Sequence, residues 1–123
     1  MPHAKRATRI LLVNGDNTVQ HLRALMLRMA GHHVDTAADI HAARAVLAAG
    51  RVYDLVIVDV GHFARHELDF CEEIKTRYPQ QRVLFQVEGH LYLNRESCPD
   101  KVVSKEDGPE HFVSEVERML QAS

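Results

Sequence analysis

Hydrophobic and polar residues follow two alternating patterns along the chain, short apolar runs and longer stretches with helical spacing. Continuous apolar runs are typical of strands that are buried on both faces of a parallel sheet. They occur at residues 9–13, 55–59, 82–87 and 101–103. A weaker run at residues 32–37 alternates between apolar and polar positions, which favours a strand near the edge of the sheet.

Between these runs, apolar residues recur every three or four positions, as on the buried face of an amphipathic helix. The first such stretch runs from Thr18 to Ala30, and we expect its apolar face to pack on the sheet; that face consists of Val19, Leu22, Leu25, Met26 and Met29. Further helices are predicted at residues 40–49, at 67–78, and from 109 to the end, where Pro109 suits the first helical turn. A short helix around 91–95 would be the fourth of five.

Five strands that alternate with five helices predict an α/β fold, a three-layer doubly wound sheet of five parallel strands with helices on both faces. The flavodoxin-like strand order 2-1-3-4-5 fits best, because the second strand looks like an edge and the first and third look central. We expect one domain over residues 1–123, with a core of about residues 9–121. In this order the loops after the first and third strands meet at the switch point, where Asp59 ends a buried strand.

Composition and charge narrow the classes of function. A net charge of −2 with interspersed signs argues against nucleic-acid binding and against a basic membrane patch. No apolar run approaches the roughly 20 residues that span a bilayer. We expect no disulfide between Cys71 and Cys98, because Cys71 falls in a helical pattern and Cys98 stands just before Pro99. The chain is therefore expected to be a cytoplasmic protein with reduced thiols.

The motifs "ILLVNGD", "AADIHAARAVL", "YDLVIVDV", "VLFQVEG" and "VVSKEDGPEHF" together cover nearly the whole chain. In this order they resemble a response-regulator receiver domain, the phosphoacceptor module of two-component signalling. The resemblance implies that Asp59 is equivalent to the aspartate that takes a phosphoryl group from a histidine kinase. It also implies that Lys105 is equivalent to the lysine that contacts the phosphate, and that the domain is not itself an enzyme.

Other positions depart from the receiver pattern. Receivers hold Mg²⁺ with an acidic pair after the first strand, and this chain has Asn14 and Gly15 there, with Asp16 next to them. The hydroxyl residue that ends the fourth strand of receivers is Val87 here, and the aromatic switch residue of the fifth strand is Val102. We therefore expect no metal site and no resident cofactor. Mg²⁺ would be a cofactor only if Asp59 is in fact phosphorylated.

These departures favour a pseudo-receiver that acts through protein contacts, with weak or no Mg²⁺-dependent phosphorylation. The expected partners are a histidine kinase or an output domain, or a second copy bound through the fourth helix, fifth strand and fifth helix. A working phosphoacceptor at Asp59 is the first alternative function. The simplest interpretation of Asp59 is that its carboxylate only pairs with Lys105.

Binding of flavin or another small ligand on the flavodoxin-like scaffold is a weaker alternative, because Asp16 would repel a phosphate at the turn after the first strand. Among the nine histidines, His62 and His66 are four residues apart, but no cysteine or carboxylate completes a zinc cluster with them.

Overall fold

The computed structural model describes residues 8–14, 17–61, 65–89 and 98–121. In this part of the chain there are five strands, four α-helices and one short 3₁₀ turn. Their order is β1 (Arg9–Val13), α1 (Thr18–Met29), β2 (His33–Ala37), α2 (Ile40–Ala48), β3 (Leu55–Val60), α3 (Arg65–Arg77), β4 (Val83–Val87), β5 (Lys101–Ser104), η1 (Lys105–Asp107) and α4 (Pro109–Gln121). All predicted strands are therefore present, with ends that agree to within a residue or two.

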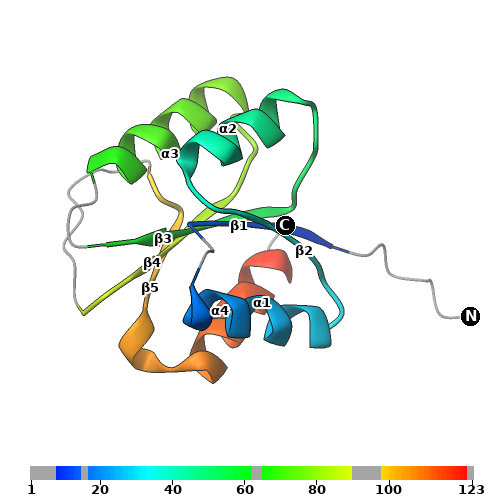
Figure 1. Cartoon of the computed structure of the whole chain (residues 1–123), viewed down its shortest axis with the longest axis vertical. Helices are drawn as coiled ribbons and strands as arrows, with labels where there is room; N and C mark the ends of the chain where they lie inside the picture. Colours follow the sequence, from blue (N-terminus) through cyan, green and yellow to red (C-terminus); the bar gives the residue numbers. More distant parts are fainter. Residues whose placement is uncertain (1–7, 15–16, 62–64, 90–97, 122–123) are drawn as a thin grey trace, which may run out of the picture.

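The five strands form one parallel sheet in the order β2-β1-β3-β4-β5, which confirms the predicted topology. Helices α2 and α3 cover one face of the sheet, and α1 and α4 cover the other (Figure 1). The short helix expected around residues 91–95 lies outside the described residues, so α4 is the helix that was predicted as the fifth. Among the described helices, none is long and apolar enough to cross a membrane.

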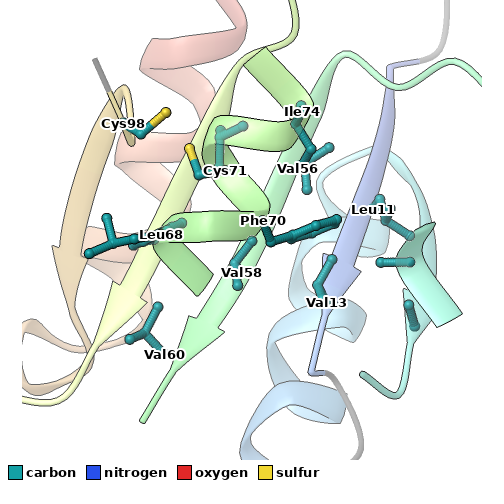
Figure 2. Packing of buried hydrophobic residues seen from close by; sticks show 14 of the residues in the cluster. Leu11, Val13, Val56, Val58, Val60, Leu68, Phe70, Cys71, Ile74 and Cys98 are labelled. Carbon is teal, nitrogen blue, oxygen red and sulfur yellow. The ribbon is translucent and has the colours of Figure 1, made fainter. Parts of the chain in front are cut away.

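Alternate residues of the central strands supply the two hydrophobic cores on either side of the sheet. Val56, Val58 and Val60 of β3 join α2 and α3 in one core (Figure 2). Leu55 and Ile57 face the other way and pack with α1 and α4. This strict alternation fixes the face on which any polar residue of β3 must lie.

The two cysteines lie in the core under α3, where Figure 2 shows their thiols turned toward each other. Cys71 and Cys98 are both buried and both free. Burial, followed by the neighbouring Cys98, raises the pKa of the Cys71 thiol. Both thiols are therefore part of the apolar packing.

Helix α1 turns a different face to the sheet than its apolar pattern predicts. Val19, Leu22, Leu25 and Met29 are 48%, 57%, 51% and 79% exposed, so the prediction that they face inward was wrong. The buried residues are instead Gln20, Arg23, Ala24 and Leu27. Two neighbouring stripes on a helix share the same spacing, and their contacts with the rest of the fold decide which one is buried.

The inner faces of the other helices agree better with the sequence pattern. In α3, Leu68, Cys71 and Ile74 are buried as predicted, whereas Tyr78, placed by the pattern on the same face, lies just beyond the helix and is exposed. In α4, Phe112 and Val116 enter the core beside α1.

Candidate functional site

Asp59 lies at the carboxyl end of β3, on the face covered by α1 and α4. It continues the series of Leu55 and Ile57, whose side chains pack against those helices. In the sheet register it stands beside Gln86 of β4. Its side chain is only 13% exposed, so a carboxylate here needs partners within the protein.

Lys105 provides the closest of these partners. It follows β5 directly, where the Ser104 hydroxyl accepts a hydrogen bond from the Glu106 amide (3.2 Å) and turns the chain. The Lys105 ammonium contacts Oδ1 of Asp59, and it lies 3.9 Å from Oε1 of the exposed Glu88. The structure thus brings together the two residues that the sequence pairs, while the catalytic roles implied by resemblance remain predictions.

Asn14 joins the end of β1 to the end of β3. Its backbone has a φ of 64°, in the left-handed region that asparagine tolerates better than most residues. Its side-chain Nδ2 donates a hydrogen bond to the carbonyl oxygen of Asp59 (2.8 Å). The other two positions of the predicted metal region, Gly15 and Asp16, lie outside the described residues.

The described side chains at this edge do not fit a Mg²⁺ ion. Mg²⁺ needs near-octahedral oxygen coordination, usually through carboxylates and water. Asp59 instead contacts an ammonium group, and Asn14 uses its amide as a donor to a backbone carbonyl. In the part of the chain that the structure describes, no three histidine, cysteine, aspartate or glutamate side chains are grouped as metal ligands.

The two predicted switch positions, Val87 and Val102, lie on the face of the sheet opposite to Asp59. Val87 is buried in the core under α3 and stands beside Val60 in the register. Val102 stands beside Phe85, on the edge strand β5, and is partly exposed. Both side chains are apolar, so neither can donate a hydrogen bond to a phosphoryl group.

Three buried polar residues on the same side of the sheet as Asp59 were missed by the sequence reasoning (Figure 1). Gln20 and Arg23 are buried in α1, and Gln86 is buried in β4. We call these three residues, together with Asp59 and Lys105, the polar layer. The available signal was Gln86 itself, a polar residue inside the otherwise apolar run "VLFQV".

The polar layer contains several groups without partners. The side-chain amides of Gln20 and Gln86 have no hydrogen-bond partner among the described residues, and neither has Nε of Arg23. Burial lowers the pKa of Arg23, and the negative charge of Asp59 opposes that shift. The layer therefore combines one carboxylate with two cationic side chains in a largely buried environment.

A pocket of about 440 Å³ lies at the amino ends of the strands, whereas Asp59 lies at the carboxyl end of β3. It is lined mainly by apolar parts of residues from the ends of α2 and α3 and the loops before β3 and β4, among them Leu47, Tyr53 and Tyr78. Its position does not coincide with the switch point at which the sequence placed a flavin or small-ligand site.

Solved structures similar to this chain include response regulators and their receiver domains. The response regulator TrrA of Thermotoga maritima, solved with Mg²⁺ and BeF, is 24% identical with a TM-score of 0.78, over 91% of this chain and 98% of that one. An orphan response regulator of H. pylori is 20% identical with a TM-score of 0.79, over 93% and 97% of the two chains. A CheY-like receiver domain protein of Methanospirillum hungatei is 18% identical with a TM-score of 0.80, over 94% of each chain.

No protein-family model matches the sequence, and no curated protein matches it. The structural similarity shows that the chain has the fold of a response-regulator receiver domain. It covers nearly the whole of this chain, as the motif resemblance predicted.

Proposed function

We propose that this chain is a receiver-type signalling domain of a two-component or phosphorelay system that acts mainly through protein contacts. In this proposal Asp59 is phosphorylated weakly or not at all in the presence of Mg²⁺, and the domain is not an enzyme. The observation that carries the proposal is the contact between Asp59 and Lys105 on a receiver fold. The two residues of that pair are retained, while the positions of the metal-binding acids hold Asn14 and Gly15.

The chemistry of phosphoryl transfer explains why this combination favours contacts over phosphorylation. Transfer to a carboxylate depends on positioning and on positive charge that offsets the charge of the phosphoryl oxygens. Lys105 provides one such charge, but its ammonium already contacts the Asp59 carboxylate. The apolar Val87 and Val102 provide no hydroxyl group through which a bound phosphoryl group could be sensed.

The partners that we propose are a histidine kinase or an output domain, in the cytoplasm. Similar folds occur within longer proteins: the match to NtrX of Brucella abortus covers 26% of that chain. For self-association we propose the surface of β5 and α4, together with the fourth helix predicted around residues 91–95, which lies outside the described residues. Val102 is an exposed apolar residue on the edge strand of this surface. Exposed apolar side chains also line α1, and such surfaces often mark interaction sites.

Exposure to acetyl phosphate and to beryllium fluoride, each with Mg²⁺, tests the proposal. Intact-mass spectrometry should show no stable adduct, and amide NMR spectra should remain essentially unchanged. Asp59→Asn is the matched control, because it removes the acceptor and keeps the shape of the side chain. A stable adduct on the unmodified protein that is lost in Asp59→Asn would replace this proposal with the working phosphoacceptor.

A further inference from the structure

Arg23 is an unusual residue in the core-facing side of α1. It is 6% exposed, and its guanidinium lies 5.4 Å from the centroid of the Phe112 ring. Its neighbours on the same face, Ala24 and Leu27, belong to the hydrophobic core. An arginine in such a place loses most of its hydration, which is costly unless a negative charge compensates.

Two carboxylates on this side of the sheet are largely withdrawn from solvent: Glu115 of α4, which pairs with Lys101 (3.3 Å) and Arg118 (3.4 Å), and Asp59. Asp59 shares the face of Leu55 and Ile57, which pack against α1, and α1 starts at the same carboxyl edge. The charges of Asp59 and Arg23 influence each other, since the Asp59 carboxylate acts to keep Arg23 protonated. The amides of Gln20 and Gln86 add polarity to this layer, but no charge.

Packing alone does not account for an arginine at this position. The aromatic ring of Phe112 provides a cation–π contact, but Nε of Arg23 has no hydrogen-bond partner among the described residues. A leucine or methionine would fill the same space without the loss of hydration. The presence of a positive charge at this buried position therefore needs an explanation.

We propose that Arg23 is the resident cation of this site: with Lys105 it compensates the charge of Asp59 from within the protein, where receivers use a divalent metal ion. This rests on the proposed function, because it explains how the carboxylate is held without the acidic pair. Arg23 is then a positioning residue. It stabilises the paired state of Asp59 and Lys105 and disfavours a second cation at the same edge.

A double-mutant cycle on the full chain tests the electrostatic link. The free energy of unfolding is measured for Arg23→Met, for Asp59→Asn and for the two together. If Arg23 compensates Asp59, the two changes are coupled, and the double variant is more stable than additivity predicts, by about tenfold in the unfolding equilibrium constant. The control is Arg28→Met, which changes the same residue type on the same helix at an exposed position and should be additive with Asp59→Asn.

Rescue by a conservative variant separates charge from packing. Arg23→Lys keeps the positive charge, so it should destabilise the protein less than Arg23→Met does, and its own cycle with Asp59→Asn should be close to additive. If Arg23→Met does not fold, Arg23→Gln removes the charge while keeping a polar side chain, and the same cycle is measured with it. Additive energies in the cycle with Arg23→Met or Arg23→Gln, or Arg23→Lys as damaging as these neutral variants, would overturn the role of resident cation.

The double-mutant cycle and the phosphorylation assay test the two proposals separately. Phosphorylation of the unmodified protein would refute the pseudo-receiver, yet a coupled cycle would still identify Arg23 as a cation of the site. An additive cycle in a protein that acetyl phosphate leaves unmodified would refute the role of Arg23 alone.

Discussion

Lys105, which follows β5, places its ammonium against the carboxylate of Asp59 at the end of β3. The two side chains are far apart in sequence, and β4 lies between their strands in the sheet. Both are mostly withdrawn from solvent, at 18% and 13% exposure, so the pair is screened less than an ion pair on the surface. This contact is the observation on which the proposed function depends.

Replacing Lys105 with methionine should destabilise the protein by about 1–3 kcal/mol, because it leaves a mostly buried carboxylate without its closest cation. Urea unfolding at neutral pH measures the change. Arg44→Met is the comparison, since Arg44 pairs with Glu73 on the surface (2.9 Å) and such pairs contribute about 0–1 kcal/mol. Equal losses in the two variants would show that the Asp59 pair contributes no more than a surface one.

The orientation of α1 can be checked by truncating one leucine on each side of the helix. Leu27→Ala should cost about 2–5 kcal/mol, because Leu27 is fully buried between α1 and the sheet. Leu22→Ala should change stability by less than about 0.5 kcal/mol, because Leu22 is exposed. The reverse ranking in thermal or urea unfolding would mean that the apolar stripe faces inward, as its pattern alone suggests.

Tyr53 should make stability fall at alkaline pH. Burial and then the hydrogen bond from its hydroxyl to Asp35 Oδ2 (2.7 Å) raise its pKa from 10.0 to about 12. Folding therefore favours the protonated phenol, and the stability that this gives is complete below pH 10 and is lost as the pH rises to about 12. Urea unfolding across this range should show the loss in the unmodified protein and a flatter profile in Tyr53→Phe. The same slope in both would assign the loss to other groups.

Two carboxylates at the predicted metal positions should create a response to Mg²⁺. Asn14→Asp with Gly15→Asp crowds anions near Asp59 and removes the hydrogen bond from Asn14 Nδ2 to the Asp59 carbonyl. Without metal, the double variant should therefore be less stable at neutral pH. Mg²⁺ should restore stability with concentration, by roughly 2.7 kcal/mol at a hundred times its Kd. If the melting temperature of the unmodified protein rises as much with millimolar Mg²⁺, then its own side chains already form a metal site.

The strand order and the place of Asp59 could be predicted from the sequence, because both follow from local patterns. Continuous apolar runs identify strands that are covered on both faces, and a parallel sheet of this size has few arrangements. The alternation of side chains along β3 then fixes the face of Asp59. Lys105 could be paired with Asp59 only through the resemblance to receivers, and the fold brings the two into contact.

The inner face of α1 and the polar layer were decided by tertiary structure. Helical spacing requires that one stripe of α1 be buried, but the stripe of Leu22 and the stripe of Arg23 satisfy the same period. Which of them packs on the sheet depends on contacts with groups that are distant in sequence, such as the ring of Phe112 beside Arg23. A buried arginine is tolerable only where the fold brings a compensating charge close to it, and no local pattern of residues contains that information.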